Sequence, residues 1–363
     1  MEIRKLNSLR GLAALIVLIG HYSNESGVWG NSLGGASGHL GVMIFFLLSA
    51  FLMSYKYLDT PPTRQAVANY AIARVARVMP LFFIVVLLSF TVHQYWPHAL
   101  NVFVYDIPDL NTLASHLLLL HGTSVLWTIP PEMHFYMLFA IAWVLRPRLQ
   151  RLLRRVATVQ QQRTLLGIVA MGAILLTLFI ILRKGDGSTI TVFGLVVVPS
   201  LKVFPYFAVG ALMGLLFLKW QPPARLCSHY FVLTLLVSPF LYPAIFQYIT
   251  DQQHGMWADV RILVCVSAVF FILIFLVPEK NRFLENWAGD MLGKISYSLY
   301  ILHFPLLLLL KDLGLAHGIS GLVVFLSLVS ALAYVSFYVL ELPIRQRLKS
   351  VFSHRISKVD PRG

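Results

Sequence analysis

The chain has 363 residues, of which 58% are hydrophobic and only 12% are charged. A soluble domain carries about 25% charged residues, so the composition excludes a disordered protein, a disulfide scaffold and an ordinary soluble enzyme. The formal net charge of +14 could indicate a nucleic-acid partner. The basic residues stand between apolar stretches, however, so we attribute them to the positive-inside bias of a membrane protein and expect no nucleic acid.

Long apolar stretches with charged flanks predict an all-α helix bundle that crosses the lipid bilayer about ten times. No cleavable signal peptide is evident after the first stretch. The stretch 190–198 fits either an additional span or a re-entrant or interfacial segment. The predicted spans are 8–22, 40–56, 79–95, 131–146, 165–182, 199–218, 230–249, 260–277, 295–311 and 319–341.

The distribution of Lys and Arg predicts the orientation of these spans. With both termini in the cytoplasm, 24 of the 29 basic residues lie on the inner side and 5 on the outer side, as the positive-inside rule requires. An eleventh span would move the basic C-terminal tail outside. We therefore predict a transmembrane domain over 1–345 and a basic cytoplasmic tail over 346–363. Residues 57–78 are expected in a cytoplasmic connection, and the stretch 93–145, which has no Lys or Arg, is expected to include an outer surface.

Two ionisable residues of the first span are functional candidates, because such groups are costly inside a bilayer. Arg10 and His21 are eleven residues apart and share one helix face, about 16 Å apart along the axis. We expect Arg10 at the cytoplasmic surface and His21 near the middle of the membrane. This spacing suits a long ligand with an anionic end, such as coenzyme A with its phosphates and its thioester-bearing arm. His21 could equally be a structural histidine.

Arg74 and Arg77 precede the third predicted span by only a few residues and lie on one helix face. Guanidinium groups are well suited to phosphate oxygens, although anchoring at the membrane surface would explain both arginines as well.

A third group of candidates surrounds Glu132. Pro130 and Pro131 fit the first turn of a helix, and the helix dipole favours a carboxylate there. We expect Glu132 at the outer face, either as a capping carboxylate or as a group that orients an acceptor hydroxyl or a nearby base. Trp127 and Tyr136 flank it.

In the ninth predicted span, Tyr297 and Tyr300 share one helix side, and His303 lies at a depth similar to that of His21, so the two histidines could meet. Packing between helices would also explain these residues. Neither cysteine has metal-ligand spacing, and the histidine pairs 93/98 and 116/121 are five residues apart, which is not a helical ligand spacing. We therefore expect no metal.

Together these segments resemble the acyltransferase-3 family of polytopic bacterial membrane acyltransferases. Arg10 and His21 match the family's Arg-x10-His signature, and Arg74 and Arg77 match its paired arginines. The remaining matches are Gly-Val-Met-Ile-Phe-Phe-Leu-Leu-Ser-Ala-Phe-Leu at 41–52, the Trp-Thr to Glu-x-x-Phe-Tyr segment at 127–136, Ser-Tyr-Ser-Leu-Tyr-Ile-Leu-His at 296–303 and Glu-Leu-Pro at 341–343. Two departures are Ala50, where the family usually has Gly, and the double proline, where it usually has Ser-Val.

The resemblance implies transfer of an acyl group from cytoplasmic acyl-CoA, usually acetyl-CoA, to a hydroxyl of a glycan or another extracytoplasmic or membrane-associated acceptor. Acceptors in the family are mostly sugars of surface polysaccharides, which include the O-antigen of lipopolysaccharide. The chain would be a stand-alone transmembrane form in the bacterial inner membrane. The alternative is a non-catalytic transporter or exporter of a small acid or glycolipid, which would also carry buried charges.

On this resemblance, the site residues take named roles. Arg10, Arg74 and Arg77 would hold the CoA phosphates, and His21 would act as general base or carry the acyl group. Glu132 would act with His21 on the acceptor side. Aromatic and polar side chains suited to a sugar would line that side: Trp127, Tyr136, Tyr297, Tyr300 and His303.

Overall fold

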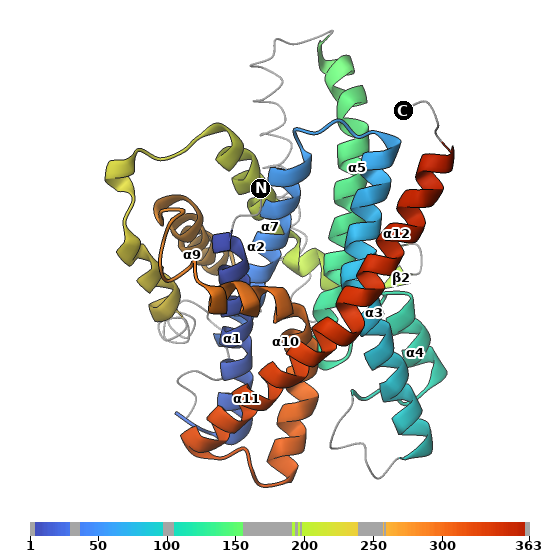
Figure 1. Cartoon of the computed structure of the whole chain (residues 1–363), viewed down its shortest axis with the longest axis vertical. Helices are drawn as coiled ribbons and strands as arrows, with labels where there is room; N and C mark the ends of the chain where they lie inside the picture. The colour runs from blue at the N-terminus through green and yellow to red at the C-terminus, as the bar shows by residue number, and fades with distance from the viewer. Residues whose placement is uncertain are drawn as a thin grey trace.

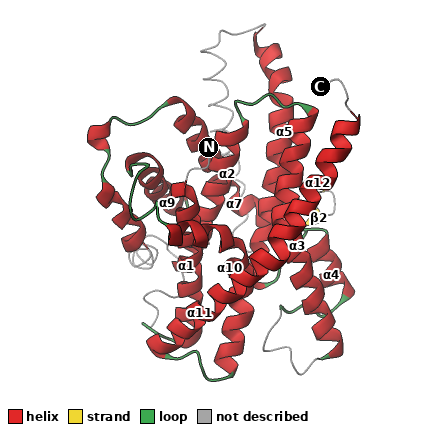
Figure 2. Cartoon of the chain, in the orientation of Figure 1, coloured by secondary structure: helices red, strands yellow, loops and turns green. Residues whose placement is uncertain are grey.

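The computed structural model describes residues 4–29, 37–96, 105–154, 191–192, 195–196, 198–238, 257 and 259–359. Within these residues the fold is all-α, apart from one pair of two-residue strands (Figures 1 and 2). The long helices are α1 (Arg4–Ser26), α2 (Ser37–Tyr57), α3 (Arg64–Tyr95), α5 (Ile129–Arg154), α7 (Val198–Lys219), α9 (Val260–Phe271), α10 (Trp287–Asp312), α11 (Gly318–Ser336) and α12 (Leu342–Val359). The shorter elements are α4 (Leu110–Leu117), the 3₁₀ helices η2 (Ser124–Thr128), η3 (Ala224–Leu226) and η4 (His229–Val232), and the π-helices η5 (Ile272–Leu276) and η6 (Phe337–Glu341).

The predicted helices are confirmed where the structure describes them, but several are longer than expected. The largest difference is α3, which begins at Arg64 and not at residue 79. The expected connection 57–78 is therefore mostly helical. The first turns of α3 mix polar and apolar residues, so a search for long apolar stretches does not detect this part of the helix. Likewise, α12 continues through the position 345/346 that we predict as a domain boundary.

Two predicted spans fall partly or wholly outside the described residues. The span 165–182 is one of them, and of the span 230–249 only the residues up to 238 are described. In the ambiguous stretch 190–198, Thr191–Val192 pairs antiparallel with Leu195–Val196 (β1 and β2). A continuous helix through this stretch is thus wrong, because four of its residues are extended.

The core of the bundle depends on close contacts between helix backbones. α1 packs against both α2 and α10, and α2 packs against α7. A Cβ atom on Gly293 of α10 would collide with the backbone of Asn7 in α1, and one on Gly210 of α7 would collide with the carbonyl oxygen of Leu47 in α2. Small residues of this kind allow helices to approach closely in membrane proteins. They fix the positions of α1, α2 and α10, which carry much of the site.

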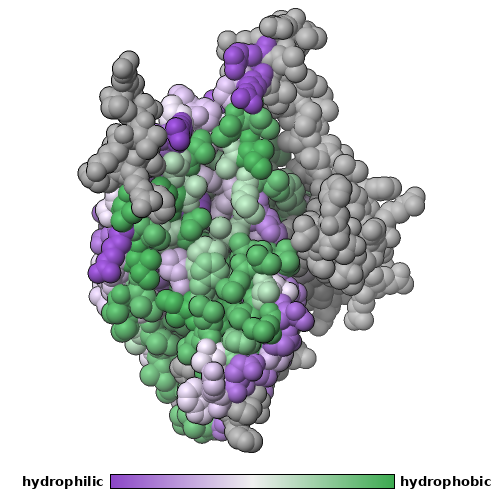
Figure 3. All heavy atoms as spheres, turned by 90° about the vertical axis from the view of Figure 1, so that its right-hand side faces the viewer, coloured by the Kyte–Doolittle hydropathy of each residue, from purple (hydrophilic) through white to green (hydrophobic). Residues whose placement is uncertain are grey.

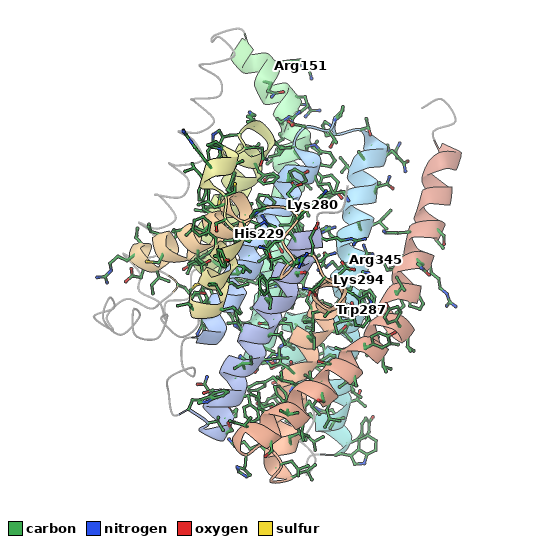
Figure 4. All side chains as sticks on the ribbon, turned by 60° about the vertical axis from the view of Figure 1, so that its left-hand side comes forward. Arg151, His229, Lys280, Trp287, Lys294 and Arg345 are labelled. Atoms are coloured by element: carbon green, nitrogen blue, oxygen red, sulfur yellow. The ribbon has the colours of Figure 1, made fainter. Side chains whose placement is uncertain are left out.

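The outside of the bundle is apolar. In the described part of the chain, four helices are long and apolar enough to cross a membrane: Gly38–Tyr57, Arg64–Tyr95, Trp287–Asp312 and Gly318–Val351. Figure 3 shows hydrophobic side chains covering much of the middle of one face. The end of α5 that carries Arg151 projects beyond the neighbouring helices (Figure 4). Several long apolar helices with such a surface indicate an integral membrane protein.

The last helices form one long rod. α11, η6 and α12 follow one another without a break and run obliquely across the bundle (Figure 1). The π-helical turn of η6 buries Glu341, which accepts a hydrogen bond from the Ser298 hydroxyl.

The other π-helix, η5, is held at its end by Lys5 of α1. The Lys5 ammonium donates to the carbonyl oxygens of Ile274 and Val277, at 2.8 and 2.6 Å. η4 is joined to the turn after η5 by Asn281, whose amide donates to the His229 carbonyl.

The segment 105–128 returns the chain from α3 to α5 and lies against the bundle. Tyr105 is buried and donates to the carbonyl oxygen of Ile301 at 2.6 Å. Asp109 caps α4 by accepting from the backbone of Asn111 and Thr112, and these hydrogen bonds lower the pKa of Asp109. The stretch 93–145, which contains this segment, is predicted to include an outer surface, and that location stays a prediction. Within the segment, Tyr105 and Val125 are buried against the bundle.

Candidate active site

One pocket lies among α1, α2, α3, α5 and α10, next to η2. It encloses roughly 520 Å³ of empty space, its open mouth included, and its walls are mostly apolar with a few charged and hydroxyl groups between them. The lining residues are Arg10, Val42, Phe45, Phe46, Ser49, Arg77, Val78, Thr128, Ile129, Glu132, Ser296, Tyr297 and Tyr300. A pocket of this kind is the usual form of a site for a small ligand.

Glu132 stands in the first turn of α5, directly after the two prolines, as the sequence predicts. Its Oε1 atom accepts two hydrogen bonds, from Ser49 Oγ at 2.9 Å and from the Tyr136 hydroxyl at 2.5 Å. We expected Arg10 at the inner surface and Glu132 at the outer surface, and this separation is wrong. Both line the same pocket, because η2 and the start of α5 lie inside the bundle, where Leu126 and Ile129 are buried.

The structure separates the two arginines of α3. Arg77 lines the pocket together with Arg10. Arg74 does not line it, and its guanidinium carbon lies 5.5 Å from the centroid of the Tyr136 ring. The Nε atom of Arg74 is buried and has no hydrogen-bond partner among the described residues. Both arginines belong to α3 itself, and not to a segment before it.

Tyr297 and Tyr300 project from α10 into the pocket wall, and both are buried. The Tyr297 hydroxyl donates to the carbonyl oxygen of Val78 at 2.6 Å, and the Tyr300 hydroxyl donates to that of Val125 at 2.9 Å. These two bonds attach α10 to α3 and to η2. The tyrosines therefore hold the pocket together in addition to lining it.

His21 and His303 meet, with ring centroids 5.1 Å apart, but neither lines the pocket. His303 is buried, and its Nδ1 atom lies 2.7 Å from the carbonyl oxygen of Tyr300. Its Nε2 atom is buried without a partner among the described residues. The centroid of the Tyr300 ring lies 5.7 Å from that of the His303 ring and 6.2 Å from that of the Phe45 ring, which belongs to the pocket wall. The histidine pair thus lies next to Tyr300 of the pocket wall without lining the pocket.

Trp127 lies behind the pocket wall. Its ring packs edge-on against Trp257 at 5.1 Å and against Phe46 at 6.3 Å. Phe46 lines the pocket, so Trp127 supports the wall without lining it.

Ser49 lines the pocket but escaped the interpretation of the sequence. It stands in the segment 41–52 that we quote for the family resemblance, where it received no role. Its signal was a polar residue inside an otherwise apolar span. Within the described residues, no group of three or more His, Cys, Asp or Glu side chains is arranged to hold a metal ion.

Comparison with known proteins gives this site a chemical class. The model of the acyltransferase domain of the acyltransferase-3 family matches residues 3–341. The O-acetyltransferase OatA of Staphylococcus aureus, in strains NCTC 8325 and COL, is 24% identical over 383 aligned residues. The match covers 94% of this chain and 57% of the relatives' own length. No solved structure matches the chain. Because the family model covers nearly the whole transmembrane bundle, this chain belongs to the acyltransferase-3 family of membrane acyltransferases.

Proposed function

We propose that this chain is an O-acyltransferase, in the simplest case an O-acetyltransferase, that modifies a hydroxyl of a glycan at the outer side of a bacterial inner membrane. The Staphylococcus aureus relatives are named O-acetyltransferases, and this supports an acetyl group as the group transferred. Acyl-CoA, most simply acetyl-CoA, supplies that group from the cytoplasm. A surface polysaccharide such as an O-antigen is the proposed acceptor class.

The proposed arrangement in the membrane has ten spans and both termini in the cytoplasm, and the 24-to-5 division of basic residues supports it. A reporter fused to the C-terminus of the full chain measures this directly. A reporter that is active only in the cytoplasm is the expected result, whereas activity only outside the cytoplasm contradicts the ten-span arrangement.

One observation carries the proposed function: the pocket brings two guanidinium groups and one carboxylate together inside an apolar bundle. Arg10 and Arg77 supply positive charge for the phosphate or thioester oxygens of the donor. Glu132 can accept the proton that an attacking hydroxyl loses. Acyl transfer needs both functions within one site, and an apolar surrounding strengthens both.

The base of the reaction has two candidates. Glu132 lines the pocket, whereas His21 does not. We therefore propose Glu132 as the base for a hydroxyl bound in the pocket. The role of general base or acyl carrier predicted for His21 from the sequence remains the alternative, with His303 as its neighbour.

The test compares surface glycans from cells without the gene and from cells that carry the wild-type gene or Glu132→Gln. Mass spectrometry should find glycan hydroxyls heavier by one acetyl group only with the wild-type gene. Because Gln keeps the shape of Glu but cannot take a proton, transfer by Glu132→Gln should fall by about 10² to 10⁴ at equal expression. Identical glycans with and without the gene would reject the proposed function.

A further inference from the structure

We propose that Ser49 is a catalytic nucleophile that carries the acyl group between donor and acceptor as a covalent ester. This inference rests on the proposed function, because it divides the acyl transfer into two steps. The residue lies on α2, lines the pocket and is 9% exposed.

The hydrogen bonds around Ser49 are those of an activated hydroxyl. Ser49 Oγ donates to Glu132 Oε1 at 2.9 Å, so its proton already points at a carboxylate. The Tyr136 hydroxyl donates to the same oxygen at 2.5 Å and fixes the carboxylate in place. A nucleophile within reach of a base, with the base held by a third group, is the general signature of covalent catalysis.

The charges of the pocket also suit this role. When a hydroxyl attacks a thioester, negative charge develops on the carbonyl oxygen, and fixed positive groups lower the barrier most effectively in an apolar site. Arg10 and Arg77 line the same pocket as Ser49. The walls between them are apolar and include Phe45 and Val78, so water weakens this attraction less than it would at an exposed site.

The two steps balance without a further reactant. In the first, Ser49 Oγ attacks the thioester carbon and its proton passes to Glu132. The carbon–sulfur bond breaks, and the leaving thiolate takes the proton from Glu132, which releases CoA. In the second, the acceptor hydroxyl gives its proton to Glu132 and attacks the ester carbon. The bond to Ser49 Oγ breaks, and that oxygen recovers the proton.

The same hydrogen bond could exist merely to join α2 to α5, since serine often connects helices in membranes. Ser54 supplies the matched control for this possibility. It lies on the same helix and is fully buried, but it does not line the pocket, and its hydroxyl has no partner among the described residues. A substitution at Ser54 removes a buried hydroxyl from α2 without touching the proposed chemistry.

The experiment measures isotope exchange between acetyl-CoA and labelled free CoA on the purified full chain in lipid vesicles, with no acceptor present. A covalent intermediate makes this exchange possible, and direct transfer does not. We expect exchange with the wild type and Ser54→Ala, and only background exchange with Ser49→Ala. Rapid acid quenching should place one acetyl group on the peptide that contains Ser49. In Ser49→Cys that group should become a thioester, which neutral hydroxylamine removes.

Three outcomes would overturn the proposal. One is the absence of exchange in a wild-type preparation that still acetylates its glycan. Another is normal glycan acetylation by Ser49→Ala. The last is exchange that survives in Ser49→Ala and disappears in His21→Ala, which would place the acyl group on the histidine. In each of these cases the wild type still acetylates its glycan, so they are distinct from failure of the proposed function, in which the wild type acetylates nothing.

Discussion

Arg74 and Arg77 show how two residues of one motif acquire different surroundings. They lie three residues apart on α3 and so share one broad side of the helix. Even so, Arg77 lines the pocket and Arg74 lies over the Tyr136 ring. Tyr136 in turn donates to Glu132, so Arg74 acts on the pocket through the tyrosine that holds the carboxylate.

Replacement of each arginine by alanine should therefore have a different effect. In Arg77→Ala, the loss of a charge-assisted contact should weaken binding of acetyl-CoA by about 1.5–3 kcal/mol, or roughly 10- to 100-fold. Arg74→Ala should bind the donor nearly as the wild type does, but unfold at a lower temperature, because it loses a stacked cation. Calorimetric titration and thermal unfolding of both variants measure this difference. Equal losses of donor affinity would show that both arginines bind phosphate, as the sequence predicts.

The histidine pair gives a second prediction at this scale. If Glu132 is the base, His21→Ala should change kcat and the KM for the acceptor by no more than a few-fold, because His21 does not line the pocket. His303→Ala should give the same change, and the double variant should be no worse than the more severe single variant, since the two rings are in contact. A fall in kcat of about 10² with unchanged KM would make His21 the general base.

Residue types and their spacing identified Arg10, Arg77, Glu132, Tyr297 and Tyr300, which meet in one pocket. Spacing along a single helix could not predict that Arg74 faces an aromatic ring or that His21 does not line the pocket. Those facts depend on which neighbouring helix fills the space beside each side chain. Ser49 was missed for the same reason, because a lone serine in an apolar span acquires meaning only from its contact with Glu132.

At the scale of elements, α4 and the segment around it depend on one neutral histidine. His116 is fully buried. Its Nδ1 atom lies 2.7 Å from the carbonyl oxygen of Thr112, and its Nε2 atom accepts from the backbone N–H of Thr123 at 2.9 Å. Burial lowers the pKa of His116 below its ordinary value of 6.5. The folded segment therefore binds the proton less readily than the unfolded segment does.

This difference predicts that the segment 105–128 loosens in acid. A group whose pKa is lowered in the folded state contributes its full stability above about pH 6.5 and loses it as the pH falls through the folded value. Hydrogen exchange of the α4 amides should therefore be faster at low pH, after correction for intrinsic rates, than at neutral pH. His116→Gln, which cannot be charged, should remove the extra acid sensitivity. If the wild type and this variant respond equally, another group is responsible.

The contact between α2 and α7 yields a prediction about packing. Since a Cβ atom on Gly210 would collide with the backbone of Leu47, Gly210→Ala should push the helices apart at a cost of about 1–3 kcal/mol. Gly38→Ala is the control, because its added atom would meet nothing closer than 3.8 Å. Size-exclusion profiles after heating should show an earlier loss of folded protein for Gly210→Ala only. Equal stability of the two variants would show that α7 moves freely.

Element boundaries were predictable only where apolar length defines them. The positions of α2, α7 and α11 follow from uninterrupted apolar runs. The first turns of α3 and the whole of α12 carry many charges, so apolar length does not predict them. They are stabilised as helices by packing against one another and by continuity with the apolar helices. A hydropathy pattern along the sequence contains neither of these contributions.

At the scale of the whole molecule, the pocket belongs to no single segment. Its lining residues range from Arg10 on α1 to Tyr300 on α10, and hydrogen bonds between distant elements join its walls. Charge distribution predicts on which side of the membrane each connection lies, but it contains no information on how deep η2 lies in the bundle. The wrong separation of Arg10 from Glu132 follows from that gap.

The rod of α11, η6 and α12 has a consequence that concerns the lipids. The part of the rod that carries no charged side chain, residues 318–340, has 23 residues and is therefore about 35 Å long, against a hydrocarbon core of about 30 Å. A helix longer than the hydrocarbon core tilts within the bilayer, and its angle responds to bilayer thickness. Because Glu341 lies within this rod and α12 packs against α3, which carries Arg77, a change in angle reaches the pocket wall. Reconstitution in lipids of increasing chain length should therefore give the fastest acetyl transfer at one intermediate thickness, so that lipid composition sets the rate of the enzyme. A rate independent of chain length would show that the rod and the pocket are uncoupled.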